Sequence, residues 1–191
     1  MKSILISIKP KWCELIANGK KTIEIRKTKP KIDTPFKCYI YCTKEKTIGD
    51  FILCKSKELS DLFGFNAAVG VNKGFANEDD WQLKEKVIGE FICDRIRPIA
   101  ILAHIMVSTV DCMHSCLSAC EILEYADGKT IYGWHISDLK IYDTPKELSE
   151  FRKYLSFFDG ESISELEGAG ISNIRLKRPP QSWCYVEGVH E

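Results

Sequence analysis

The chain opens with a strand–helix–strand pattern over residues 4–26, and this pattern constrains the fold more than any other stretch. The apolar residues 4–8 predict a strand, and Pro10 suits the first turn of a helix over residues 11–18. Gly19 is a natural residue to end that helix. Polar and apolar side chains then alternate along a predicted strand at residues 22–26. The first elements are therefore two strands joined by a helix of one or two turns.

Alternation along the second strand gathers polar groups on one of its faces. That face carries Lys20, Thr22, Glu24 and Arg26. The opposite face carries Lys21, Ile23 and Ile25. A strand face with this many charges is either a solvated outer surface or the wall of a polar site.

The remaining elements are mostly strands. Strands are expected at residues 36–43, 52–54, 86–97, 131–141 and 179–186, with a continuation of the sheet over 98–110 as a further option. Gly89 can mark a bulge. Ser118 and Glu121 form a capping box that opens a helix ending near Gly128, and Thr144 with Glu147 predicts a second helix over 145–155. Many strands with few helices and no regular alternation predict an α+β fold, a small mixed β-barrel with peripheral helices.

Length and charge limit the classes of protein that the chain can be. Its 191 residues fit one domain over 1–191, with insertions expected near 56–85 and 156–173. The net charge of zero argues against non-specific binding of nucleic acid by the whole surface. Residues 1–46, however, hold 12 Lys and Arg against 4 Asp and Glu, so that a polyanion could be attracted locally. A lysine-rich solvated surface is the other interpretation.

The nine cysteines are an odd number, and no secretory or membrane-spanning segment is visible. We therefore expect a cytoplasmic protein with reduced thiols and no contact with a membrane. A metal site could use Cys112, Cys116 and Cys120 with His114, but the paired two-residue spacing of structural zinc sites is missing. The expectation is no metal, and no cofactor either, because no glycine-rich phosphate loop is present.

Several polar residues are candidates for chemistry. Lys21 could act as a base or nucleophile if its amine is desolvated, with Glu24 or Glu90 as a partner carboxylate. His135 follows Trp134 and precedes Ser137, but a structural histidine is the simpler interpretation. A surface row of ion pairs is likewise the simpler interpretation for Lys20, Glu24 and Arg26.

Two segments resemble a known family. Residues 5–10 (Leu-Ile-Ser-Ile-Lys-Pro) and the pattern G-x-K-x-x-E-x-R, matched by Gly19, Lys21, Glu24 and Arg26, are similar to the ASCH domain, a branch of the PUA-like superfamily. Residues 87–96, 132–143 and 179–186 also resemble members of that family. The resemblance implies a small mixed β-barrel with helices outside it and a cleft that binds RNA or modified bases.

The resemblance also implies an alternative activity. One small bacterial type of this family is similar to an amidohydrolase of N4-acetylcytidine that uses a lysine, a threonine and a glutamate. Its lysine matches Lys21, but Glu24 stands at the threonine position, and Glu90 is the candidate for the third residue. The enzyme assignment is therefore open.

The favoured hypothesis is a module that binds nucleic acid, RNA rather than DNA, or a modified nucleoside. Phosphate contacts are expected from Lys9, Lys20, Lys21 and Arg26, stacking from Trp12, Trp134 or Trp183, and recognition of an exocyclic amine from Glu24. Two further ligand-binding candidates are His135 and Ser137. An adaptor that binds only proteins is a third possibility, suggested by the acidic remainder of the chain.

Overall fold

The computed structural model describes residues 2–44, 84–99, 107–154 and 175–188. The strand expected at 52–54 and the insertion expected at 156–173 lie outside these residues. Of the insertion expected near 56–85, only residues 84 and 85 are described.

The described chain contains eight strands and three α-helices, with one short 3₁₀ turn. The strands are β1 (Lys2–Ile8), β2 (Ile23–Arg26), β3 (Phe36–Cys42), β4 (Lys86–Cys93), β5 (Ile96–Ile99), β6 (Ile131–His135), β7 (Ser137–Glu147) and β8 (Trp183–Glu187). The helices are α1 (Pro10–Ala17), α3 (Thr109–Ser115) and α4 (Ala119–Ala126), and the 3₁₀ turn is η2 (Leu148–Glu150).

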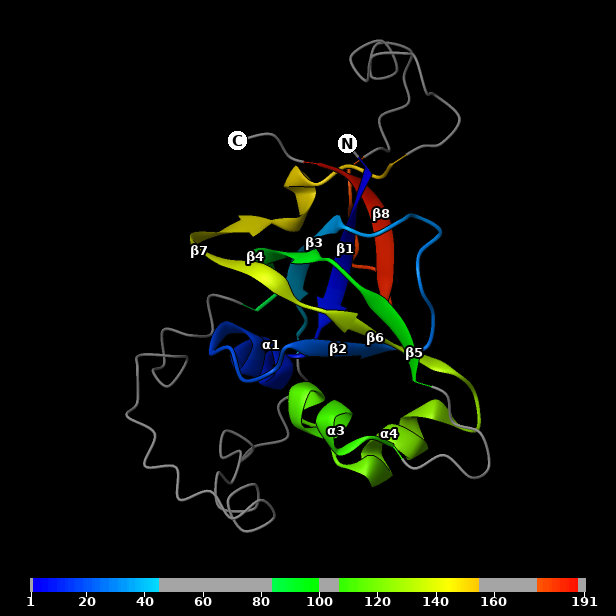
Figure 1. Ribbon diagram of the computed structural model, residues 1–191. Coiled ribbons are helices and arrows are strands. Elements are labelled where there is room, and N and C mark those ends of the chain that lie inside the picture. Colours follow the sequence, from blue (N-terminus) through cyan, green and yellow to red (C-terminus); the bar gives the residue numbers. More distant parts are fainter. Residues whose placement is uncertain (1, 45–83, 100–106, 155–174, 189–191) are drawn as a thin grey trace.

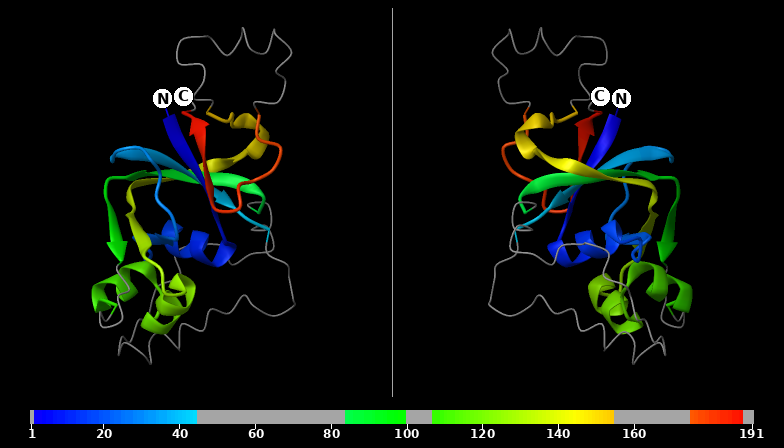
Figure 2. Two further views of the ribbon diagram at one scale, coloured as in Figure 1. Left: turned by 90° about the vertical axis from the view of Figure 1, so that its right-hand side faces the viewer. Right: turned by 90° about the vertical axis from the view of Figure 1, so that its left-hand side faces the viewer.

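The strands form two sheets (Figures 1 and 2). The larger has the order β7-β4-β3-β1-β8, in which β1 and β3 run parallel and the other pairs are antiparallel. The smaller has the order β2-β6-β5 and is antiparallel. The predicted mixed α+β class is confirmed, but the strands in the described ranges pair as two sheets and not as one closed barrel.

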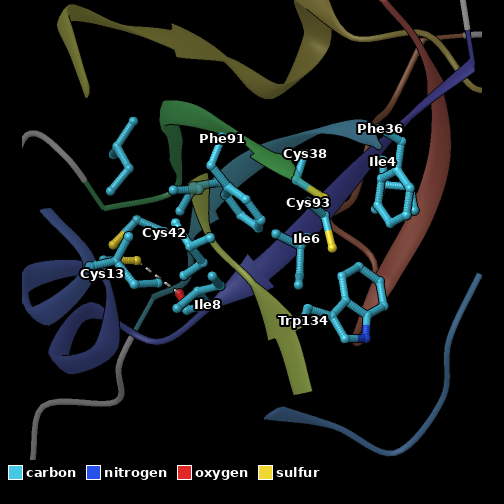
Figure 3. Close-up of a cluster of buried hydrophobic side chains, with 14 residues drawn as sticks. Ile4, Ile6, Ile8, Cys13, Phe36, Cys38, Cys42, Phe91, Cys93 and Trp134 are labelled. Carbon is cyan, nitrogen blue, oxygen red and sulfur yellow. Dashed lines mark hydrogen bonds between the residues drawn. The ribbon is translucent and has the colours of Figure 1, made fainter. Parts of the chain in front are cut away.

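Apolar side chains fill the space between the two sheets (Figure 3). The larger sheet contributes Ile4, Ile6, Cys38 and Phe91, and Trp134 enters this core from β6. A second cluster covers the other face of the larger sheet, where Phe151 packs against the strands. A third lies between the smaller sheet and helices α3 and α4. The layers are thus an outer covering, the larger sheet, the smaller sheet and the helix pair.

The strand predicted over 86–97 is two strands in different sheets. Asp94 and Arg95 separate β4 from β5, and both are exposed. The strand predicted over 131–141 likewise divides at Ile136 into β6 and β7. In each case the hydrophobic pattern continues because both halves face the same core, although they belong to different sheets.

The helix predicted over 145–155 is wrong. Strand β7 continues through Pro145 to Glu147, where Lys146 lies opposite Val87 in the ladder. Since β7 is an edge strand, the missing N–H of Pro145 is tolerated. A capping box is found three residues later, formed by Glu147 and Glu150, and opens only the 3₁₀ turn.

Other local predictions are confirmed. Pro10 begins α1, and Ser118 with Glu121 forms the capping box of α4. The β4 register shifts beside Gly89, as expected of a bulge. Of the predicted continuation of the sheet over 98–110, Pro98 and Ile99 belong to β5, residues 100–106 lie outside the described residues, and α3 begins at Thr109. No helix in the described residues is long and apolar enough to cross a membrane.

Candidate functional site

Three charged side chains from the segment 21–26 form one buried cluster. Glu24 Oε1 lies 2.9 Å from Arg26 Nη2, and Glu24 Oε2 lies 3.4 Å from Lys21 Nζ. Lys21 is 2% exposed, Glu24 6% and Arg26 8%. Two cations therefore share one carboxylate, and the cluster carries a formal charge of +1 away from bulk water.

The backbone before β2 explains how Lys21 joins this cluster. Gly19, with φ +69°, ends α1, and the strand begins only at Ile23. The Lys21 N–H is held by the carbonyl of Leu15, so alternation does not apply to it. The prediction that Lys21 faces away from Glu24 is therefore wrong. Glu24 and Arg26 do share a face, because both belong to the strand.

Lys20 and Thr22 do not share the face predicted for them. Lys20 is exposed, and its carbonyl accepts a hydrogen bond from Cys116 Sγ. Thr22 Oγ1 and His114 Nδ1 share a hydrogen bond of 2.7 Å. Both residues thus contact the end of α3 instead of the buried cluster.

Helix α3 also fixes the Lys21 ammonium. Lys21 Nζ donates to the carbonyl of Ser115, the last residue of α3, at 2.7 Å. The C-terminal end of a helix carries partial negative charge, which favours a cation there. The same ammonium lies 5.0 Å from the ring centroid of Trp12 on α1. Lys21 is therefore held between two helices and Glu24.

Arg26 connects β2 of the smaller sheet to β1 and to the segment before β8. Its Nη2 donates to the carbonyl of Ser7 on β1 at 2.6 Å, and its Nη1 donates to Ser182 Oγ before β8 at 3.3 Å. Its Nε is buried and has no hydrogen-bond partner among the described residues. A buried donor without a partner is costly, so this N–H is a point where an acceptor from a ligand would be favourable.

Aromatic residues surround the charged cluster. Trp134 lies opposite Glu24 in the β2–β6 ladder, which puts both side chains on one face. Trp134 is fully buried, its Nε1 lacks a partner within the described ranges, and its ring lies 5.8 Å from that of Trp183. Complete burial identifies Trp134 as part of the core. Trp12 and Trp183 are half-buried and remain the candidates for stacking.

The charges of the cluster affect the pKa values of two nearby residues, Tyr125 on α4 and Cys116 at the end of α3. The pKa of Tyr125 is raised, chiefly by burial; Arg26 opposes the shift, and Glu24 raises the pKa further. Burial also raises the pKa of Cys116, against the opposing effect of Lys21. Both residues thus lie close enough to sense the buried charges.

Lys9 lies at the start of α1 and is exposed. Its carbonyl accepts the first backbone hydrogen bonds of the helix, from Trp12 and Cys13. Lys9 is thus an exposed residue at the N-terminal end of the helix that carries Trp12.

The structure does not bring Glu90 to this cluster. Glu90 belongs to the larger sheet, where Lys37 Nζ lies 2.8 Å from its Oε1 and the Tyr142 hydroxyl donates to its Oε2 at 2.6 Å. Burial alone would raise the pKa of Glu90, but these two hydrogen bonds lower it below its ordinary value. Its contacts are those of a structural ion pair.

His135 and Ser137 also have partners of their own. His135 Nδ1 lies 2.6 Å from Asp94 Oδ1, and Ser137 donates to the carbonyl of Ile92 at 2.9 Å. The first contact joins the end of β6 to the β4–β5 turn, and the second joins the start of β7 to β4. Neither residue contacts Lys21, Glu24 or Arg26 in the described chain.

No group of three residues suited to a metal ion occurs in the ranges that the structure describes. Cys112 and His114 lie on α3, whereas Cys120 lies on α4, so the break between the helices interrupts the regular spacing. Cys112, Cys116 and Cys120 therefore do not lie on one face of a single helix.

Sequence reasoning did not identify the residues, distant in the chain, that form hydrogen bonds to Lys21 and Arg26. Ser115 and Ser7 contribute backbone carbonyls, and any residue type could do so. Ser182 contributes a hydroxyl from 156 residues away. Only its position before the last predicted strand could have drawn attention to it.

Comparisons with known proteins agree with this architecture. The family model of the ASCH domain matches residues 6–87. The structure of an ASCH protein from Zymomonas mobilis is similar, with a TM-score of 0.53 and 15% identity, covering 97% of this chain and 87% of that one. A mutant of that protein with phenylalanine in place of a tyrosine aligns with a TM-score of 0.52 and 16% identity, covering 98% and 91%. No curated protein matches the chain.

Proposed function

With residues 6–87 assigned to the ASCH domain family, a branch of the PUA-like superfamily, we propose that the protein binds RNA or a modified nucleotide at the Lys21–Glu24–Arg26 cluster. The observation that carries this proposal is the excess positive charge of the cluster. One carboxylate is shared by two cations, and the Arg26 Nε is buried with no partner in the described chain. A phosphate or a base carbonyl supplies the acceptor that this site lacks.

Different residues around the cluster contact different parts of the ligand. The exposed ammonium groups of Lys9 and Lys20 attract phosphates from solution. Trp12, half-buried beside Lys21, offers a surface on which a base can stack. Base–aromatic stacking contributes about 1–3 kcal/mol per base and tolerates many bases. Glu24 can accept a hydrogen bond from an exocyclic amine, as carboxylates do with cytosine.

A titration of labelled single-stranded RNA and DNA oligonucleotides at two salt concentrations tests the proposal. Lys21→Met keeps the length of the side chain but removes the charge. It should weaken RNA binding by about tenfold, equivalent to 1.4 kcal/mol. Lys129→Met, at an exposed lysine after α4, is the matched control and should leave the affinity unchanged. Absence of binding to any oligonucleotide by the unmodified protein would contradict the proposal.

One contact favours hydrolysis of an acylated nucleoside as a second candidate function. The Lys21 amine is 3.4 Å from the Glu24 carboxylate, and both are buried, so that an amine and a carboxylate lie within a short movement of hydrogen-bond reach. Incubation with N4-acetylcytidine, followed by chromatography, tests this activity, with Lys21→Ala as the control. Turnover that disappears in the variant would establish an amidohydrolase in which Glu24 replaces the expected threonine. No turnover would leave the binding function alone.

A further inference from the structure

A hollow with a cationic lining lies beside the β8 edge of the larger sheet, where Lys153 pairs with Val186 of β8 and Arg152 pairs with Arg175. Its volume is about 200 Å³, and its lining residues are Lys153, Arg175, Lys177 and Arg178. These residues come from the two segments that follow η2 and precede β8, at the end of the molecule where β1 begins and β8 ends (Figures 1 and 2). Helices α3 and α4 lie at the opposite end.

Buried neighbours fix the positions of these cations. Leu176 is 3% exposed, packs with Phe151 and Val186, and donates its N–H to the Phe151 carbonyl at 2.9 Å. Because side chains alternate along an extended segment, Arg175 and Lys177 point away from the side that Leu176 buries. The positive groups are thus presented outward by a segment that is anchored in the core.

No acidic side chain neutralises this hollow in the described chain. None of the four lining residues forms an ion pair with a carboxylate there. Four cationic side chains around one hollow create a local positive potential that attracts an anionic ligand. Two arginine guanidinium groups and two ammonium groups match phosphate oxygens, which guanidinium binds in a two-pronged geometry. The volume is smaller than the roughly 300 Å³ of a drug-sized pocket, so phosphate groups fit better than a whole nucleotide.

The hollow is connected by a short stretch of chain to the site proposed above. Arg178 is four residues from Ser182, which accepts the hydrogen bond from Arg26. Four extended residues span at most about 14 Å, which is about four times the 3.4 Å of helix axis for each phosphate in one strand of a duplex. One strand can therefore contact Ser182 and the hollow together, round the edge formed by β8.

We infer that this hollow is a phosphate-binding subsite for the backbone of the nucleic-acid strand whose base or nucleotide is held at the Lys21–Glu24–Arg26 cluster. The inference rests on the proposed function. It assigns the hollow a role in affinity and in salt dependence, and no role in the choice of base, because phosphate contacts position a strand without reading its sequence.

The test compares two triple variants of the full chain. Arg175→Gln, Lys177→Gln and Arg178→Gln together remove three charges from the hollow. Lys44→Gln, Lys129→Gln and Lys146→Gln remove three charges elsewhere. The affinity for a labelled single-stranded RNA is measured at several salt concentrations. For single strands, the slope of log K against log salt falls by about 0.7 for each phosphate that the protein no longer neutralises.

The expected result is a slope reduced by about 1.4 or more in the hollow variant, as when two or more phosphates are released, with the control variant close to the unmodified protein. Equal slopes in the two variants, while Lys21→Met still weakens binding, would overturn the subsite and leave the proposed function standing. No RNA binding by the unmodified protein would overturn both.

Two further probes separate other sources of negative charge. If inorganic pyrophosphate binds to the hollow while the RNA slope is unchanged in the variant, the site serves a small phosphate and the inference is wrong. If poly-glutamate binds more tightly than RNA and its binding disappears in the hollow variant, the partner is an acidic peptide and the inference is again wrong. Weak, variant-independent binding of both probes supports the assignment to the nucleic-acid backbone.

Discussion

Arg26 and Glu24 form a buried ion pair on one face of β2, with Nη2 and Oε1 2.9 Å apart, and Lys21 approaches the other carboxylate oxygen. Burying charged groups carries a desolvation cost that their mutual attraction only partly offsets. A cluster of this kind is therefore weak evidence of optimised stability. It is better explained by a role that requires charge at this place, which agrees with the proposed binding site.

The unequal charges of the cluster predict unequal effects of substitution. Glu24→Ala leaves two buried cations with no carboxylate, and the expected loss is about 3–5 kcal/mol of unfolding free energy. Lys21→Met leaves the Arg26–Glu24 pair intact and replaces the ammonium with an apolar group, so we expect a smaller loss. Urea unfolding followed by circular dichroism measures both. Glu124→Ala, at an exposed glutamate of α4, is the control and should change little. A larger loss for Lys21→Met than for Glu24→Ala would contradict this account of the charges.

Glu90 predicts a pH-dependent contribution to stability. Hydrogen bonds from Lys37 and Tyr142 outweigh the effect of burial and lower its pKa in the folded state. The folded protein therefore binds fewer protons at Glu90 than the unfolded chain, and stability rises with pH. The contribution is fully present above the unfolded pKa of about 4.3 and is lost as the pH falls through the lower folded pKa.

We therefore expect Glu90→Gln to be destabilised by about 1 kcal/mol at pH 7, as is usual for the loss of a partly exposed ion pair. The difference should shrink as the pH falls through the lowered folded pKa and vanish where the carboxyl group is protonated in both states. Urea unfolding at pH 7, 5 and 3 measures it. A difference that stays constant over this range would show that the ion pair is not its source.

The sequence predicted this fold well where local chemistry decides the structure. The capping box at Ser118 and the helix opened by Pro10 depend on a few adjacent residues, and both are confirmed. The helix expected at Pro145 failed because pairing of Lys146 with Val87, far away in sequence, outweighed the local capping pattern. Tertiary contacts of this kind leave no local signal.

The candidate site divides in the same way. Glu24 and Arg26 could be placed together because they alternate on one strand. Lys21 could not, since its position depends on the turn that follows Gly19 and on the carbonyl of Ser115. Trp134 was expected to be available for stacking, but its place on the core face of β6 buries it completely.

Burial predicts a clear order of thiol reactivity among the described cysteines. Burial raises the pKa of Cys93 to about 12 and that of Cys184 to about 11, and it also raises the pKa of Cys13 and Cys38. Cys120 on α4 is exposed. Because the thiolate is the reactive form, iodoacetamide at a mildly alkaline pH should modify Cys120 first. Peptide mass spectrometry after short reaction times, with a urea-unfolded sample as the control, measures the order. Early modification of Cys13 or Cys38 would show that the core opens readily.

Gly89 predicts a sharp steric effect. A Cβ at this position would lie 2.5 Å from the carbonyl oxygen of Lys140, so that β7 would have to move away from β4. Gly89→Ala should therefore lose about 1–3 kcal/mol of unfolding free energy, as overpacked positions do. Gly128 gives the matched comparison, because its surroundings are open and only its φ of +70° favours glycine. Asparagine tolerates that conformation, so Gly128→Asn should be nearly neutral whereas Gly89→Asn should be as damaging as alanine. Thermal unfolding of these three variants and of the unmodified protein tests this prediction. Equal melting temperatures for the two asparagine variants would show that the close approach of β4 and β7 does not restrict the side chain at position 89.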